Sequence, residues 1–442
     1  MESDDLRKSV ERGEIDTVLL ALTDMQGRLQ GKRFHARHFV DAIAEHGAEA
    51  CNYLMAVDVD MTTVDGYAMA GWERGYGDFE MVCDLATLRP VPWQEATAIC
   101  LADLRWADGS DVVASPRQVL RRQLARLAER DWTANAGTEL EFQVFRTSYE
   151  DAWRSGYRDV EPANLYNVDY SLLGTARVEP LVRRIRNAMY AAGLQVEDSK
   201  GECNLGQHEI NFRYQDALRA CDEHVVYKNG AKEIAAQEGM AITFMAKYDQ
   251  REGNSCHIHL SLADANGDNV FASDDALFDR FVAGLLATLR DLTLFLAPNV
   301  NSYKRFAEGS FAPTAVAWGH DNRTCSLRVV GHGAGRRVEC RAGGADLNPY
   351  LALSALIAGG LHGIDNELAL EPPCEGNAYV SGHPRLPTTL RDARDLFEGS
   401  AVAREAFGEE VVGHYLNNAR VELAAFDAAV TDWERFRGFE RL

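Results

Sequence analysis

The chain has 442 residues, of which 46% are hydrophobic, so it can bury a large core and is long enough for two or more domains. Its net charge of −21 argues against nucleic acid or an anionic membrane as a partner. The first residues are acidic, no apolar run has the length of a membrane span, and the nine cysteines include no CxxC pair. These features predict a cytoplasmic protein with reduced thiols.

The first hundred residues predict a small unit of mixed strands and helices. Val18–Leu22 is a short apolar strand, Asp24–Gly27 is a turn, and Gly31–Phe34 has the pattern of a returning hairpin strand. A polar turn at Ala107–Ser110 then marks a boundary, and Ser115 and Pro116 are typical of a helix start. We therefore expect an N-terminal domain over residues 1–108 and a larger one over residues 109–442.

Three segments of the larger part share one pattern, in which chemically active side chains occupy alternate positions. They are Gly137–Phe142, His257–Ser261 and Arg337–Arg341. In a strand, alternate side chains point to the same face, so Glu139 and Glu141 lie side by side. Neighbouring carboxylates repel each other unless a cation neutralises them. The pattern predicts a sheet whose polar face lines a site, although a solvated strand face explains the glutamate pair taken alone.

A second acidic cluster spans residues 202–209, where a glycine-containing turn could bring two more carboxylates to the same point. Five carboxylates and one imidazole are too many oxygen ligands for zinc and suit Mg²⁺ or Mn²⁺. Their summed charge makes a site with two divalent ions plausible. The candidate ligands are Glu139, Glu141, Glu202, Glu209, His257 and Glu339.

A group of arginines follows within about forty residues of sequence. Guanidinium groups bind phosphate and carboxylate through paired hydrogen bonds, so the group suggests a polyanion and a carboxylate substrate. Surface salt bridges are the alternative for any single member. The arginines are Arg305, Arg323, Arg328, Arg337 and Arg341.

From Trp132 onward strands and helices mix without strict alternation, which predicts an α+β fold instead of a doubly wound sheet. The last stretch, Leu386–Arg437, is expected to be mostly helical.

Several sequence blocks resemble, in order, those of the glutamine synthetase superfamily, type I branch. The blocks are GTELEF (137–142), ECNLGQHEI (202–210), TFMAK (243–247), GNSCHIHLSL (253–262), NSYKRF (301–306), RVECR (337–341) and NPYLA (348–352). The resemblance implies a small N-terminal β-grasp domain and a large catalytic domain with a curved antiparallel sheet, a half-barrel flanked by helices. It also implies a homo-oligomer, a dodecamer of two hexameric rings with sites shared between neighbouring subunits.

The reaction implied by the resemblance is phosphoryl transfer from ATP to the γ-carboxylate of L-glutamate, followed by attack of an amine on the acyl phosphate. Two or more Mg²⁺ or Mn²⁺ ions would take part. One ion would be held by Glu141, Glu202 and Glu209, and the other by Glu139, His257 and Glu339.

The resemblance also assigns roles to the remaining candidates. Catalysis falls to Arg323, Arg328, Arg341 and Glu339. Substrate binding falls to Arg305, Arg341, Gly253, Glu141 and Phe311. Nucleotide binding falls to His259, Ser261, Arg337, Arg328, Glu197 and Tyr214.

The departures from the family pattern concern the amine. The N-terminal FDGSS-type loop is absent, Phe311 occupies the place of the flap glutamate, and Glu252 stands where the family usually has asparagine. Losing two anionic groups removes the means of holding a small ammonium ion, and an aromatic residue favours an organic amine. We therefore expect a ligase of glutamate with a polyamine, ethanolamine or an alkylamine. An ordinary glutamine synthetase, a ligase of another acid and a non-catalytic homologue are the alternatives.

Overall fold

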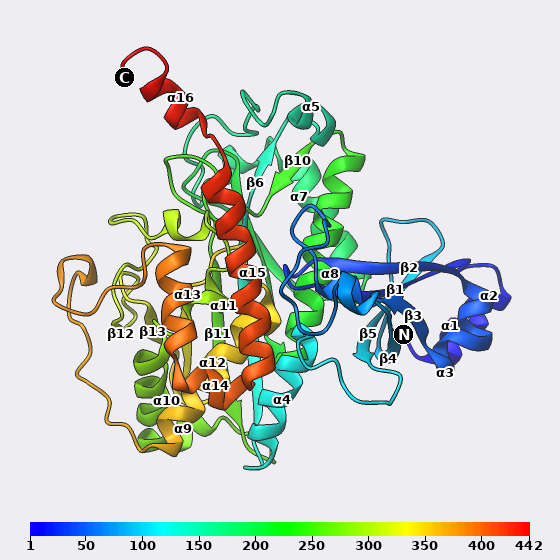
Figure 1. The fold of residues 1–442 in the computed structure, drawn as a ribbon, viewed down its shortest axis with the longest axis horizontal. Helices are drawn as coiled ribbons and strands as arrows, with labels where there is room; N and C mark the ends of the chain where they lie inside the picture. The colour runs from blue at the N-terminus through cyan, green and yellow to red at the C-terminus, as the bar shows by residue number, and fades with distance from the viewer.

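The computed structural model describes all residues, 1–442, and shows two β-sheets with helices packed around them (Figure 1). The first sheet has five strands in the order β2-β1-β5-β4-β3. The predicted hairpin is confirmed, since β1 and β2 pair antiparallel, whereas β1 and β5 pair parallel. The strands are β1 (Thr17–Thr23), β2 (Leu29–His35), β3 (Ala48–Cys51), β4 (Asp78–Pro90) and β5 (Thr97–Arg105).

A polar turn after β5 leads into helix α4 (Pro116–Ala128), as predicted. Ser115 occupies the N-cap position, but its side chain makes no capping hydrogen bond. Val119, Leu120 and Leu127 are fully buried on one face of the helix. Burial of this face, more than the cap, therefore fixes the helix against the sheets.

The second sheet carries the three patterned segments. It has nine strands, with the main order β12-β13-β14-β11-β6-β8-β7, and β9 and β10 both pair with β6. Every pairing is antiparallel except that of β12 with β13. The strands are β6 (Thr133–Phe145), β7 (Val196–Gly201), β8 (Gln207–Phe212), β9 (Gln215–Asp216), β10 (Ala241–Thr243), β11 (Cys256–Ala263), β12 (Trp318–His320), β13 (Leu327–Val330) and β14 (Arg337–Cys340).

Helices cover this sheet and confirm the α+β prediction (Figure 1). The C-terminal stretch is helical, as expected. None of the helices combines the length and the apolar character that a membrane crossing requires. The main helices are α1 (Ser3–Glu11), α5 (Tyr149–Arg154), α6 (Leu172–Thr175), α7 (Glu179–Ala191), α8 (Ala217–Gln237), α10 (Asp275–Thr288), α12 (Pro349–Asp365), α13 (Leu390–Gly399), α14 (Ala401–Phe407), α15 (Glu409–Ala428) and α16 (Asp432–Gly438).

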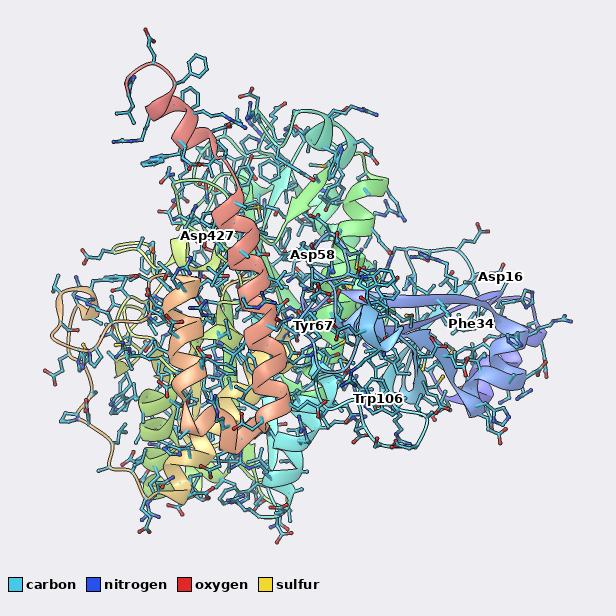
Figure 2. The ribbon with its side chains drawn as sticks, in the orientation of Figure 1. Asp16, Phe34, Asp58, Tyr67, Trp106 and Asp427 are labelled. Carbon is cyan, nitrogen blue, oxygen red and sulfur yellow. The ribbon has the colours of Figure 1, made fainter.

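The hydrophobic core of the N-terminal sheet continues into the C-terminal helices, because one buried cluster joins Leu20 and Phe79 to Phe295 and Tyr415. Figure 2 shows Tyr67, on a loop between β3 and β4, beside α15. There the side-chain amide of Asn417 donates a hydrogen bond to the carbonyl oxygen of Asp65 in the same loop. The division of the chain at residue 108 remains a prediction, and this shared core ties the two sides of it together.

Helices α10 and α12 approach each other closely through glycines. A Cβ atom at Gly284 would overlap the carbonyl oxygen of Gly359 and lie against the amide of Gly363. We expect Gly284→Ala to lower the free energy of unfolding by roughly 1–3 kcal/mol, because one helix must move away from the other. Gly413→Ala is the control, since Gly413 on α15 has open space around it and alanine favours a helix. Equal urea midpoints for wild type and Gly284→Ala would contradict this packing.

Candidate active site

The strand register creates two clusters of candidate ligands on one face of the second sheet. On β6, Glu139 lies opposite His257 of β11, and Glu141 lies opposite Glu209 of β8. The two glutamates thus face different neighbouring strands, so each joins a different cluster. The potential ligand atoms of Glu139, His257 and Glu339 lie within 4.8 Å of one another. The same limit holds for Glu141, Glu202 and Glu209.

In the first cluster, every carboxylate has a cationic or imidazole partner. Nδ1 of His257 lies 3.0 Å from Oε2 of Glu139, and Nε2 of His259 lies 2.8 Å from Oε1. Arg328 donates to Glu339 over 2.9 Å, and Arg341 also donates to Glu339. The fully buried Glu339 is therefore neutralised from two sides.

The second cluster is held mainly by neutral donors. The Ser255 amide donates to Glu141 over 2.7 Å, and the Gln207 side chain donates to the same oxygen over 3.0 Å. Asn211 donates to Glu209 over 2.8 Å. The one cation in contact is Lys200, whose ammonium group pairs with Glu202.

This difference between the clusters shifts the carboxyl pKa values in opposite directions. Burial, and then the charge of Glu202, raises the pKa of Glu141 to about 8, and burial and Glu141 raise that of Glu209 well above its usual value. Burial opposes ionisation of Glu139 too, but the hydrogen bonds from His257 and His259 hold its pKa well below the usual value. Burial lowers the pKa of His257 to about 4, so its ring is neutral. The second cluster therefore needs an added cation far more than the first.

The two clusters open into a cavity of about 510 Å³. Arg323, Arg328 and Arg341 line it, together with Gly253 and Phe311. The family resemblance assigned all five of these residues to the substrate or the phosphates. In the structure they line the same cavity. Four of its 25 lining residues are hydrophobic, so an organic group would find a few apolar side chains among many charged and polar ones.

A second cavity of about 530 Å³ adjoins the first, and Glu139 lines both. Its lining includes the five residues expected at the nucleotide that do not line the first cavity. These are Glu197, Tyr214, His259, Ser261 and Arg337. The Arg337 guanidinium also donates to Nδ1 of His259 over 3.1 Å, which fixes the ring that reaches Glu139.

Arg305 lies apart from the other predicted arginines. It is fully buried, lines neither cavity, and donates to the carbonyl oxygens of Arg341 and Gly343 over 2.7 and 2.6 Å. Its Nε–H has no partner. In this structure Arg305 supports the backbone that carries Arg341, and its role at glutamate remains a prediction.

Phe311 lines the first cavity on a loop between Arg305 and β12, with 55% of its surface exposed. Its φ of 57° lies in the left-handed region that residues with a side chain rarely adopt. The carbonyl oxygen of Phe311 accepts a hydrogen bond from Arg341 over 3.3 Å. This contact holds the aromatic residue next to the arginine that serves the first cluster.

Sequence reasoning missed a set of polar and aromatic residues on one side of the first cavity. Lys200 and Glu202 alternate on and just after β7, so the pattern used for β6 could have found the lysine. The loop before α6 has no periodic pattern, and nothing in the sequence places it at the cavity. The missed lining residues include Asp169, Tyr170, Leu172, Lys200, Gln207 and Asn211.

Comparisons with known proteins agree with this geometry. Residues 113–437 match the catalytic domain of glutamine synthetase. The chain is 64% identical to the gamma-glutamylethanolamide synthetase of Streptomyces coelicolor over 99% of this chain and 96% of that protein. It is 38% identical to the glutamate–isopropylamine ligase of a Pseudomonas species, over 98% and 96%. A solved structure of a GmaS/ADP complex superposes with a TM-score of 0.86 at 28% identity, covering 98% of this chain and 99% of that one.

The raised pKa of Glu141 predicts an unusual pH dependence in chelator-containing buffer. In the folded protein Glu141 keeps its proton up to about pH 8, whereas in the unfolded chain it loses the proton near pH 4.5. The contribution of Glu141 to the free energy of unfolding therefore falls as the pH rises from about 5 to about 8. We expect Glu141→Gln to exceed the wild type in stability at pH 8 by roughly 1–3 kcal/mol, because the amide keeps an acceptor for Ser255. Urea unfolding at several pH values measures this.

Glu139→Gln is the matched control on the same strand. The pKa of Glu139 is lowered in the folded state, so its contribution is present at neutral pH and is lost as pH falls. The expected result is therefore destabilisation at pH 7, opposite in sign to Glu141→Gln. Two variants that shift stability in the same direction would contradict the asymmetry of the clusters.

Proposed function

Since this chain belongs to the glutamine synthetase family, we propose that it is an ATP-dependent ligase that joins the γ-carboxylate of L-glutamate to ethanolamine. The observation that carries the proposal is Phe311, which lines the same cavity as both carboxylate clusters. An aromatic ring there gives a carbon chain an apolar contact and offers no charge to hold an ammonium ion. Ethanolamine is favoured over the other organic amines because the relative with 64% identity is named for the ethanolamide product.

We propose that the two clusters hold two divalent cations, Mg²⁺ or Mn²⁺. The donor chemistry fits, because five of the six ligands are hard carboxylates and the second cluster lacks enough positive charge of its own. Bound there, the ions would neutralise phosphate oxygens during phosphoryl transfer. Glu141, Glu202 and Glu209 would hold one ion, and Glu139, His257 and Glu339 the other.

The arginines of the first cavity supply the rest of the charge. In the proposed reaction, Arg323, Arg328 and Arg341 bind the transferred phosphoryl group and the glutamate carboxylates, and they stabilise charge that develops as the acyl phosphate forms. Glu339 orients Arg328 and Arg341 by accepting hydrogen bonds from both. In the proposed reaction Phe311 shields the acyl phosphate from water. The neutral amine nitrogen attacks the carbonyl carbon of the γ-glutamyl phosphate, the bond from that carbon to the phosphate oxygen breaks, and the nitrogen loses a proton as the amide forms.

The assembly belongs to the same proposal. The C-terminal helix α16 projects away from the body of the chain (Figure 1). Its Trp433 and Phe436, and Phe439 directly after it, are exposed. Aromatic side chains left in solvent are typical of a surface that a partner covers. We propose a homo-oligomer, a dodecamer of two rings, in the cytoplasm, where the nine free thiols stay reduced. Light scattering on the intact protein measures its mass.

The proposal is tested by phosphate release from the purified protein with ATP, Mg²⁺ and L-glutamate. Ethanolamine is compared with ammonium, methylamine, isopropylamine and putrescine at matched concentrations of free base. Turnover with ethanolamine well above that with ammonium supports the proposal. Turnover mainly with ammonium would identify an ordinary glutamine synthetase. The absence of phosphate release with every amine tested would refute ligase activity on glutamate.

Replacing the aromatic residue with a carboxylate should change the choice of amine. We expect Phe311→Glu to raise the ratio of ammonium to ethanolamine turnover by about tenfold, because a carboxylate beside the cavity attracts a small cation and a tenfold change needs only about 1.4 kcal/mol. Phe311→Leu, which keeps an apolar side chain, is the control and should leave ethanolamine preferred. An unchanged ratio in Phe311→Glu would show that this position does not select the amine.

A further inference from the structure

Lys200 is a lone lysine in a wall of carboxylates that the proposed chemistry does not use. It lies on β7 opposite Glu209 of β8, which in turn lies opposite Glu141 of β6. Its side chain is 22% exposed and lines the first cavity. The register thus places one fixed positive charge at the edge of the second cluster.

The ammonium group of Lys200 connects that cluster to a neighbouring loop. Nζ pairs with Glu202 on one side and lies 4.0 Å from Oδ1 of Asp169 on the other. It also lies 4.8 Å from the centroid of the Tyr170 ring, within the range of a cation–π interaction. The ammonium group of Lys200 thus lies between two carboxylates and an aromatic ring.

The loop that carries Asp169 and Tyr170 is fixed against β7 by its backbone. The Tyr170 amide donates to the carbonyl oxygen of Gly201 over 3.4 Å. A Cβ atom at Gly201 would overlap the carbonyl oxygen of Val168, so the two segments touch directly. Tyr170 has a φ of 51°, a conformation that persists only where surrounding contacts hold it.

This loop and the start of α6 supply two of the four hydrophobic residues that line the first cavity. These four residues are Tyr170 on the loop, Leu172 at the first position of α6, Cys203 and Phe311. The carbon atoms of an organic amine have few other side chains to pack against. Tyr170 is otherwise 72% exposed, so its ring depends on Lys200 for a defined position.

We propose that Lys200 is a positioning residue, which ties the amine-facing wall formed by Tyr170 to the Glu141–Glu202–Glu209 cluster. This inference rests on the proposed function, because it assumes that an organic amine fills that side of the cavity. The lysine sets the affinity for the amine by holding the tyrosine ring. It leaves glutamate binding, which we place near Gly253 and Arg341, nearly unchanged.

The test is steady-state kinetics of Lys200→Met and Lys200→Arg with saturating ATP and Mg²⁺. In Lys200→Met we expect the KM for ethanolamine to rise about 5–10-fold, because one cation–π contact and one ion pair are lost. The KM for glutamate should stay within about twofold of the wild-type value. Lys200→Arg keeps the charge and its reach to the ring, so both KM values should stay near those of the wild type.

Tyr170→Leu provides the second measurement and sits on an exposed loop where folding is not at risk. It should raise the KM for ethanolamine by itself. In the double variant, Lys200→Met should add less than about twofold to that effect, since the ring that the lysine holds is already gone.

Three results would overturn the inference: an unchanged KM for ethanolamine in Lys200→Met, an equal rise in the KM for glutamate, or independent effects of the two substitutions. These outcomes differ from failure of the proposed function, in which the wild type itself would not turn over ethanolamine. Thermal unfolding of each variant confirms that it is folded before the KM values are compared.

Discussion

Two glutamates spaced one residue apart on a central strand impose the arrangement of the whole site. Strand geometry places Glu139 and Glu141 on one face, and their charges must be compensated within a partly buried sheet. The two neighbouring strands supply different partners. β11 places the imidazole of His257 beside Glu139, and β8 places the carboxylate of Glu209 beside Glu141. The strand order of the second sheet thus determines that there are two clusters of different composition.

The two clusters solve the charge problem in different ways. Glu339 accepts hydrogen bonds from Arg328 and Arg341, so the first cluster is already balanced by the protein. The second has three carboxylates and only Lys200 beside them, which leaves an excess of negative charge. Raised carboxyl pKa values are the signature of that excess. Of the two divalent cations that we propose, the one at the second cluster would therefore compensate more unbalanced charge, whereas the first cluster also orients Arg328 and Arg341.

The sequence predicted the parts of the site that follow from strand periodicity. Alternation on β6 and its register with β11 and β8 bring Glu139 to His257 and Glu141 to Glu209. The six candidate ligands form the two groups that the family resemblance implied. Side-chain direction at an irregular position is a different matter. Arg305 lies in a short 3₁₀ segment, where no period fixes its direction, and the fold turns it toward backbone carbonyl oxygens. Tyr170 reaches the cavity through tertiary packing against β7, which leaves no local signal in the sequence.

In the function that we propose, strands carry the residues of the chemistry and loops carry the residues that select the amine. The ligands and Arg328 lie on or next to strands whose hydrogen-bonded neighbours fix them, and a change there disturbs several charges at once. Phe311 and Tyr170 lie on two loops, each with a left-handed backbone at the aromatic residue. Such loops can change sequence without altering the sheet, so a site of one chemistry can accept a different amine. Lys200 connects the strands to one of these loops, because it lies on β7 and its ammonium group contacts Asp169 and Tyr170.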